Sequence, residues 1–505
     1  MRESGVLLPI FALPSKYGIG CFSKEAYEFV DFLKKAGQKN WQILPLGQTG
    51  YGDSPYQSFS TFAGNPYFID LEELIAQGYL TVEECEAFDW GKSQQYVDYE
   101  KVYQSRYQVL RLAFDRYPLK DDKKFQKFVK NQAFWLEDYA LYTAIKKEQG
   151  GKSWMEWDEK LRYRDAKALD KCRKKLSDEL QFVRFQQYLF FTQWKRLKTY
   201  ANKKGIQIIG DIPIYVALDS ADTWSDTRLF QFNTKTGEPV AVAGCPPDYF
   251  AATGQLWGNP LYDWKYHKKT GYQWWLKRIA SCFTLYDVVR VDHFRGFDEY
   301  YSIPYGDETA VNGHWEKGPG LSLFTAIKKK MGEVRIIAED LGYLTDTVRE
   351  LVRDTGYPGM KVLQFAFDAE SESDYLPHKY DKNCIVYTGT HDNDTTRSWY
   401  EGISKKDRKF TERYLNYKNM PVEEASNQLI RLAMASVANL CIIPMQDYLN
   451  LDCSCRMNTP STLGDNWKWR LLPGQITREL TKSMRGLAEI YFRCEKKAKK
   501  EKANK

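Results

Sequence analysis

The sequence has little that would hold a metal ion or a nucleotide. It contains five histidines in 505 residues and no CxxC pair, and its closest cysteines are Cys453 and Cys455. It also lacks the GxxxxGK(S/T) and GxGxxG loops that bind phosphates, and the EF-hand pattern that binds calcium. Because zinc, calcium and nucleotide sites need such spacings, we expect no cofactor and no metal.

Long apolar runs are also missing. No run approaches the roughly 18 residues that a membrane-spanning helix needs. The apolar stretch from Met1 to Leu13 is too short for a signal peptide and has no basic start beyond Arg2. The ten cysteines are scattered from Cys21 to Cys494, which indicates incidental thiols in a reducing compartment rather than a disulfide framework. We therefore expect a cytoplasmic protein that does not associate with a membrane.

The positive charge is concentrated at one end of the chain. The net charge is +7, and the segment from Glu495 to Lys505 alone contains six lysines and two glutamates. A lysine-rich end is usually a solvated tail. The rest of the chain has no basic stripe interleaved with aromatic residues, so we expect no nucleic acid partner.

The composition is that of a globular protein with many aromatic residues. Hydrophobic residues make up 43%, charged residues 28% and aromatic residues 15%. Most of the aromatic residues are expected to pack in the core, and a minority to line a groove for flat ligands such as sugars or bases. The length allows two to four domains, or one large barrel with insertions.

Short apolar runs that end at polar or glycine residues alternate with helical patterns. The runs are near-continuous rather than alternating, which is typical of strands buried on both faces of a parallel sheet. Eight such units indicate a closed (β/α)8 TIM barrel of the α/β class rather than an open sheet. The predicted strands are Trp41–Gly47, Tyr67–Asp70, Ile206–Asp211, Tyr286–Asp292, Arg335–Glu339, Met360–Phe367, Cys384–Thr388 and Leu440–Met445.

One long stretch departs from this alternation. Residues 80–200 carry helical stripes and are interpreted as a helical insertion subdomain after the second strand. The clearest stripe has spacings of 4, 3, 4 and 3 and is typical of an amphipathic helix; it comprises Tyr103, Tyr107, Leu110, Phe114 and Tyr117. We expect these aromatic residues to belong to the core rather than to a ligand site. The whole chain, 1–505, is then a single catalytic barrel domain.

Four carboxylic acids stand at or just beyond predicted strand ends: Asp211, Asp292, Glu339 and Asp392. In a βα barrel the chemistry lies at the carboxyl ends of the strands. Any single acid there is as well explained by a helix N-cap, but four that converge on one barrel mouth indicate a catalytic site. The alternative is a metal cluster, which remains open because His293 and His391 each adjoin one of these acids.

The local context suggests separate roles for two of the acids. Arg290 and Asp292 are two residues apart on a strand, so their side chains share a face, and the guanidinium should lower the pKa of Asp292. An ionised carboxylate is what a nucleophile requires. Glu339 follows an apolar run, and this dry setting should raise its pKa, as suits a general acid. One charged and one protonated carboxylate form the catalytic pair of a retaining glycosidase. Arg290 is equally consistent with a structural salt bridge.

These residues resemble a known family. Asp211, the segment 290–293, Glu339 and the pair 391–392 are similar to the four signature regions of the α-amylase clan. The resemblance is closer to its amylomaltase (disproportionating enzyme, 4-alpha-glucanotransferase) branch. The segments that carry this closer resemblance are GDSPYQS at 52–58, AGNP at 63–66, GQLWGNP at 254–260, NTP at 458–460 and NW at 466–467.

The resemblance implies further roles at the sugar where the chain is cleaved. Tyr56 would stack against that sugar. Asp392, with His391 beside it, would hold its hydroxyls, and hydrogen bonds to the 2-hydroxyl strengthen in the transition state. Asp211 would support the site from nearby, and Arg290 completes the set of predicted binding residues. For Tyr56 the competing interpretation is core packing.

On the acceptor side, the resemblance implies that Trp257 lines the groove where the acceptor glucan lies, with loop aromatics such as Tyr249 and Phe250. Core packing is again the alternative. The glycine- and proline-rich segment around Trp257 favours an exposed loop at the barrel mouth, where binding residues gather.

The predicted function is that of a 4-alpha-glucanotransferase, with Asp292 as nucleophile, Glu339 as acid/base and Asp392 as third carboxylate. It would move α-1,4-glucan segments from a donor maltooligosaccharide or starch chain to another glucan or glucose by retaining double displacement. A retaining α-amylase-like hydrolase would use the same three acids and remains an alternative. A non-catalytic glucan-binding protein is a further one. The expected partners are maltooligosaccharides and α-1,4-glucans.

Overall fold

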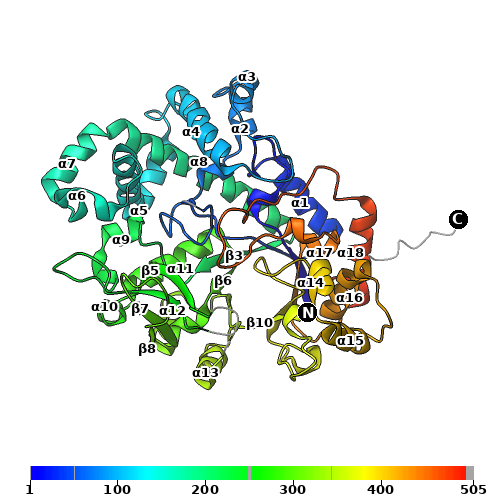
Figure 1. Ribbon diagram of the computed structural model, residues 1–505. Helices are drawn as coiled ribbons and strands as arrows, with labels where there is room; N and C mark the ends of the chain where they lie inside the picture. Colours follow the sequence, from blue (N-terminus) through cyan, green and yellow to red (C-terminus); the bar gives the residue numbers. More distant parts are fainter. Residues whose placement is uncertain (1, 51, 248–251, 343, 496–505) are drawn as a thin grey trace.

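A computed structural model describes residues 2–50, 52–247, 252–342 and 344–495. Within these residues, eight parallel strands form one sheet in the order β10-β11-β12-β1-β2-β3-β6-β9. Their bounds are β1 Glu3–Leu7, β2 Asn40–Gln42, β3 Gln207–Pro213, β6 Val288–Asp292, β9 Ile336–Ala338, β10 Gly359–Val362, β11 Cys384–Tyr387 and β12 Leu440–Pro444. The strands lie at the centre of the molecule with helices around them (Figure 1).

The two ends of this strand order meet, so that the sheet is nearly closed as a barrel. The backbone N–H of Ala338 in β9 donates to the carbonyl of Pro358, next to β10, at 3.0 Å. Asp340 Oδ1 accepts from the N–H of Met360 in β10 at 2.7 Å. A Cβ on Gly359 would lie 2.3 Å from Asp340 Oδ2, so only glycine leaves room for this contact. The predicted TIM barrel is therefore confirmed.

The barrel interior is apolar and is built by side chains from most of the strands. They form one buried cluster that comprises Leu7, Ile209, Val288, Ile337, Met360, Val362, Ile385, Tyr387 and Ile442. The side chain of Gln42 also lies inside, where it accepts a hydrogen bond from Tyr387 Oη at 2.9 Å. Such a filled interior makes the barrel a core rather than a pore, and leaves its mouth as the place for chemistry.

Seven of the predicted strands coincide with barrel strands, and one prediction is wrong. Within the run 67–70, Tyr67 and Phe68 instead belong to the 3-10 helix η2 (Pro66–Phe68), because Asn65 caps it by accepting from Tyr67 N and proline suits its first position. Asp70 caps the next helix, α2 Leu71–Ala76. The missing strand is β1. It is paired on both sides, with Val6 opposite Ile443 in β12 and opposite Trp41 in β2.

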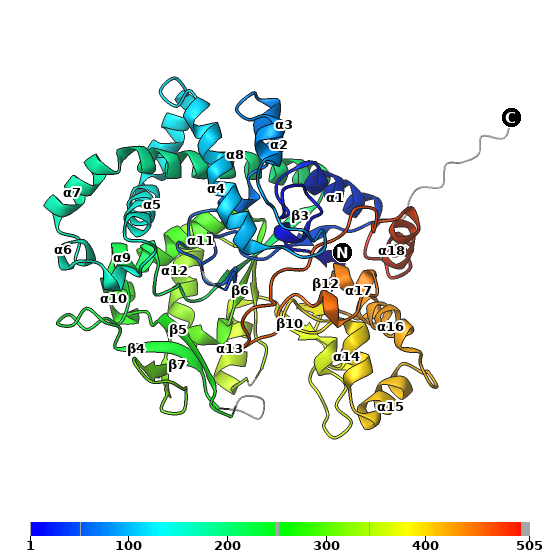
Figure 2. The ribbon, with the colours of Figure 1, turned by 45° about the horizontal axis from the view of Figure 1, so that its top comes forward.

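Helices cover the outside of the barrel, and the longest of them lie between β2 and β3 (Figures 1 and 2). The helices between these two strands are α2 Leu71–Ala76, α3 Val82–Glu86, α4 Tyr99–Arg116, α5 Lys123–Glu148, α6 Glu159–Arg162, α7 Ala166–Lys175 and α8 Ser177–Lys203. The others are α1 Lys24–Lys35, α9 Ala221–Ser225, α10 Trp264–Lys269, α11 Gln273–Leu285, α12 Leu321–Met331, α13 Asp346–Thr355, α14 Thr396–Gly402, α15 Lys405–Tyr414, α16 Val422–Ala435, α17 Met445–Tyr448 and α18 Arg478–Ile490. None of the described helices is both long and apolar enough to cross a membrane.

The predicted stripe on α4 is only partly buried. Leu110 and Phe114 pack in the core, as expected. Tyr103, in contrast, is 61% exposed, and it lines a cavity of about 1400 Å³ together with Tyr107. Tyr107 also packs against the core, so the expectation that the whole stripe belongs to the core is wrong for Tyr103 but not for Tyr107. The division into one barrel domain with a subdomain at 80–200 stays a prediction.

A second, antiparallel sheet stands beside the barrel. In the described residues it has the order β5-β4-β7-β8, with β4 Ala241–Cys245, β5 Gln255–Pro260, β7 Glu299–Pro304 and β8 His314–Lys317. Its first two strands are inserted between β3 and β6, and the other two between β6 and β9. The apolar pattern of the sequence did not indicate this sheet. It matters for the site because β5 carries Trp257.

Candidate active site

The four predicted carboxylic acids lie at the carboxyl ends of barrel strands. Asp211 is in the second half of β3, Asp292 is the last residue of β6, Glu339 follows β9 directly, and Asp392 is in the loop after β11. Parallel strands all end at the same rim of a barrel, so these side chains share one mouth. The strands β3, β6 and β9 are also neighbours in the sheet, which brings the first three acids side by side.

Arg290 joins two of these acids beneath the mouth. It lies opposite Asp211 in the β3–β6 register. Its Nη1 donates to both carboxylate oxygens of Asp211 at 2.7 and 2.8 Å, and its Nη2 lies 3.0 Å from Asp292 Oδ1. Arg290 and Asp211 are fully enclosed, whereas the Asp292 side chain keeps 31% of its exposure and faces the mouth. Removing the arginine would leave a buried carboxylate without its partner, at a cost of about 3–5 kcal/mol.

Glu339 is held by backbone amides rather than by a cation. Its Oε2 accepts from His293 N at 2.7 Å and its Oε1 from Leu341 N at 2.8 Å. His293 has a left-handed φ of 54°, in the turn that directs its N–H toward Glu339. Burial, and then the negative charge of Asp292, raise the pKa of Glu339 to about 7. The predicted rise is confirmed, and the group is poised to exchange a proton near neutral pH.

Asp292 differs from the prediction in one respect. Arg290 acts to lower its pKa, as expected, but burial is the larger effect and the pKa is raised overall. The negative charge of Asp392 adds to the rise. Arg290 contacts Asp292 and favours its ionised form, whereas the described hydrogen bonds to the Glu339 carboxylate come from backbone amides. The expected division into one ionised and one protonated carboxylate stays a prediction.

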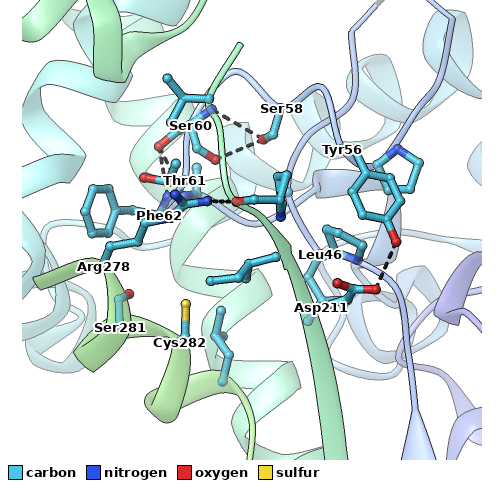
Figure 3. A pocket seen from close by; sticks show the side chains of 18 of the residues that line it. Leu46, Tyr56, Ser58, Ser60, Thr61, Phe62, Asp211, Arg278, Ser281 and Cys282 are labelled. Atoms are coloured by element: carbon cyan, nitrogen blue, oxygen red, sulfur yellow. Dashed lines mark hydrogen bonds between the residues drawn. The ribbon is translucent and has the colours of Figure 1, made fainter. Parts of the chain in front are cut away.

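Tyr56 links the Asp211 side of the mouth to His391. Its hydroxyl donates to Asp211 Oδ2 at 2.9 Å (Figure 3). The same oxygen lies 2.9 Å from His391 Nε2. The Tyr56 and His391 rings lie nearly parallel, with centroids 5.4 Å apart. Because the tyrosine proton is donated to Asp211, the tyrosine oxygen is free to accept from His391, which burial keeps neutral by lowering its pKa. A cavity of about 50 Å³ is lined in part by Leu46, Tyr56 and Asp211 (Figure 3).

Asp392 has three neighbours that fix its position. His391 Nε2 lies 3.3 Å from its Oδ2, and Asn458 Nδ2 donates to its Oδ1 at 2.6 Å. The backbone carbonyl of Asp392 accepts from Arg456 Nη2 at 2.7 Å. The Asp392 side chain is still 41% exposed, so it remains open to a ligand in the mouth.

Trp257 lies within reach of the same centre. Its ring meets that of His293 edge-on at 4.8 Å, and its Nε1 donates to Gln255 Oε1 at 3.0 Å. Trp257 is in strand β5 and not in a loop, which corrects the expectation from its glycine-rich surroundings. The predicted partners Tyr249 and Phe250 lie outside the described residues.

All eight predicted site residues thus belong to one contact network. The ring of Trp257 contacts that of His293, and the backbone N–H of His293 donates to Glu339. Asp292 directly precedes His293 in the chain. From there the network runs through Arg290, Asp211, Tyr56 and His391 to Asp392. The described residues contain no cluster of three or more His, Cys, Asp or Glu side chains that would hold a metal ion.

The sequence analysis missed Asn458 and Arg456 as site residues. Both reach Asp392 from a loop more than 60 positions further along the chain. Asn458 belongs to the NTP segment that resembles the amylomaltase branch, and this segment was the available signal. Nothing in the pattern indicates which carboxylate it would meet.

Comparison with known proteins gives consistent results. A family model described as 4-alpha-glucanotransferase matches residues 8–476. A 4-alpha-glucanotransferase from Clostridium butyricum is 51% identical over 487 residues, which cover 96% of this chain and 100% of the relative. Another, from Streptococcus pneumoniae serotype 4, is 49% identical over 495 residues and 97% of each chain. The structure of amylomaltase from Streptococcus agalactiae in complex with acarbose has 41% identity and a TM-score of 0.94, covering 98% of this chain and 100% of that one.

Proposed function

The chain belongs to the 4-alpha-glucanotransferase family, and we propose that Asp292, Glu339 and Asp392 catalyse its reaction. The enzyme moves α-1,4-glucan segments from a donor chain to another glucan or glucose, with retention of configuration. The observation that carries the assignment is the contrast between two neighbouring acids: Asp292 contacts Arg290, whereas Glu339 is held by two backbone amides and has a pKa raised to about 7.

In the first half of the reaction, Glu339 donates its proton to the glycosidic oxygen as that bond breaks. Asp292 attacks the anomeric carbon and forms a glycosyl ester, while the reducing-end part of the donor leaves as an alcohol. Arg290 keeps Asp292 ionised for this attack and remains balanced by Asp211 afterwards. The configuration at the anomeric carbon is inverted once.

In the second half, Glu339 acts as a base. It takes the proton from the acceptor hydroxyl, whose oxygen attacks the anomeric carbon and releases Asp292. The second inversion restores the original configuration, and Glu339 regains its proton for the next cycle. A pKa near 7 suits both directions, because neither protonation state is strongly disfavoured at neutral pH.

The remaining residues bind the sugar at the point of cleavage. Tyr56 offers a ring face over the mouth, and Asp392 and His391 offer acceptors and donors for its hydroxyls. Asp211 is fully buried, with both oxygens engaged by Arg290 and Tyr56, so its role is to orient these two side chains and not to touch the glucan.

Transfer competes with hydrolysis at the glycosyl ester, since water and a sugar hydroxyl attack in the same way. Trp257 beside His293 provides an apolar wall next to the nucleophile, where the face of an acceptor glucose can pack. A bound acceptor has its hydroxyl already oriented, and such orientation is worth several kcal/mol. This supports transfer over the hydrolase alternative, as does the name of the family.

Incubation of the pure enzyme with maltotriose tests this function. We expect free glucose together with a ladder of longer maltooligosaccharides, and a nearly constant total of reducing ends. Reducing ends that rise in step with maltotriose consumption, without longer chains, would identify a hydrolase. Unchanged maltotriose would favour a glucan-binding protein.

Two further expectations stay predictions. The absence of a nucleic acid partner depends on the distribution of charge. The cytoplasmic location depends on the scattered cysteines.

A further inference from the structure

Asp447 is a buried carboxylic acid that the mechanism above does not use. It lies in α17, just after β12, and is only 3% exposed. In the described part of the chain no lysine, arginine or histidine forms an ion pair with it, and burial raises its pKa. A carboxyl group in such a place costs stability unless its oxygens are well supplied with hydrogen bonds.

In the described residues, the hydrogen bonds to the Asp447 carboxylate come from two threonines. Thr388 Oγ1 donates to Asp447 Oδ2 at 2.5 Å. Thr396 donates twice, from its N–H to Oδ1 at 2.8 Å and from Oγ1 to Oδ2 at 2.7 Å. Thr388 directly follows β11, and Thr396 is the first residue of α14. One side chain thus fastens both ends of the loop 388–396.

This loop carries His391 and Asp392, and it is also held from its other side. Gln364, which follows β10, donates from Nε2 to the carbonyl of Asp394 at 2.9 Å. Because β11 lies between β10 and β12, each neighbouring strand supplies one anchor. Gln364 also meets both ends of the loop, through its N–H to the carbonyl of Thr388 at 3.2 Å and its Nε2 to Thr396 Oγ1 at 3.5 Å. The hydrogen bonds to the Asp447 carboxylate are shorter, at 2.5 to 2.8 Å, so Asp447 is the stronger of the two anchors.

We propose that Asp447 is a positioning residue for the transfer reaction. It holds the loop 388–396 so that Asp392 meets the sugar in the orientation that the transition state needs. The proposal rests on the role of Asp392 proposed above. A carboxylate suits this task because its oxygens only accept hydrogen bonds, so it can bind all three donors of Thr388 and Thr396 at once. The side-chain amide of an asparagine would instead direct an N–H donor toward the threonine hydroxyls. A displacement of about 1 Å at a catalytic group can cost about a hundredfold in rate.

The test is a double-mutant cycle between Asp447 and Asp392. Asp447→Ala is made in the wild-type and in the Asp392→Asn background, and kcat and KM for maltotriose are measured. In the wild-type background we expect kcat to fall about 10- to 100-fold with KM changed less than about threefold. In the Asp392→Asn background the same substitution should change kcat less than about threefold, because the group through which it acts is already gone.

Two companion experiments separate positioning from general destabilisation. Thr396→Val removes one of the hydroxyl donors and should lower kcat, whereas Thr396→Ser keeps it and should restore activity. Asp70 caps α2 by accepting from Glu72 N at 3.0 Å, outside the network of site residues. Asp70→Ala should therefore lower the unfolding midpoint and leave kcat unchanged.

Several results would overturn the inference. Asp447→Ala with wild-type kcat and KM, and only a lower unfolding midpoint, would make Asp447 purely structural. An equal loss of kcat in both backgrounds would show that it does not act through Asp392. If Asp447→Ala does not fold, equal kcat values for Thr396→Val and Thr396→Ser would overturn it instead. A wild-type enzyme without transfer activity would overturn the proposed function, and this inference with it.

Discussion

The raised pKa of Glu339 predicts that this residue makes the protein less stable as the pH rises. Below about pH 4.5, its ordinary pKa, both the folded and the unfolded chain hold the proton. Between pH 4.5 and 7 the unfolded chain releases the proton while the folded chain retains it, so the free energy of unfolding falls. Above pH 7 the loss is complete, and a pKa moved from 4.5 to about 7 corresponds to about 3 kcal/mol.

Glu339→Gln removes this charge and so tests the prediction. The amide cannot ionise, so the variant should gain stability over the wild type between pH 5 and pH 8, by up to about 3 kcal/mol. Its oxygen can accept from only one of the two amides of His293 and Leu341 that the carboxylate binds, which lowers the stability of the variant by a similar amount at every pH. The quantity to measure is therefore how the difference in unfolding free energy between Glu339→Gln and the wild type changes with pH, and not the size of that difference at one pH.

The assay is chemical unfolding of both proteins at pH 5 and pH 8. Glu86→Gln, at an exposed position of α3, measures the background effect of the substitution. In parallel, kcat/KM of the wild type should fall about tenfold for each pH unit above about 7, as the general acid loses its proton. The reasoning is refuted if Glu339→Gln and the wild type differ by the same free energy at both pH values, or if kcat/KM stays level up to pH 9.

Four other predictions concern the same centre. Asp292→Asn should lower turnover on the order of 10⁴-fold while the protein still folds, since Asp211 continues to balance Arg290; near wild-type turnover would exclude Asp292 as nucleophile. Glu339→Gln should still accept a fluoride-activated donor, and mass spectrometry should find the sugar on Asp292, whereas an adduct on another residue would contradict the assignment. Asp392→Asn should lower kcat about 10²- to 10³-fold with a much smaller loss of affinity; the reverse pattern would make Asp392 a binding residue only. Trp257→Ala should raise the share of reducing ends released from maltotriose or slow transfer, and an unchanged product ladder would argue against an acceptor role.

The barrel could be predicted from the sequence because its strands are buried on both faces and read as apolar runs. The same property explains the error at 67–70, because a short buried apolar run does not distinguish a strand from one turn of helix. Asn65 and Pro66 were the signals for a turn there. The strand β1 was missed because its apolar residues run on through Leu8 and Pro9 to Leu13 without alternation, so nothing in the pattern marks a strand that ends at Leu7.

The site was predictable where chemistry follows strand position. Asp292 and Glu339 end their strands, so one rule places them together. The contact of Asn458 with Asp392 could not be predicted from strand position, since Asn458 lies in a loop far along the chain. The direction of the pKa shift of Asp292 could not be predicted either. It depends on how deeply the barrel mouth encloses the side chain, whereas the sequence spacing shows only the arginine beside it.

The place of β1 in the sheet affects how the chain folds while it is being synthesised. β1 pairs with β12, whose paired residues, such as Leu440 opposite Glu3, come about 440 positions later in the chain. At a synthesis rate of about 5–20 residues per second, the ribosome needs roughly 20–90 s to make the partner strand. During that time the nascent barrel is an open sheet with one edge of β1 exposed, and such an edge is a site for aggregation. The expression yield of this enzyme should therefore depend on chaperones that shield the first strand until the last one emerges.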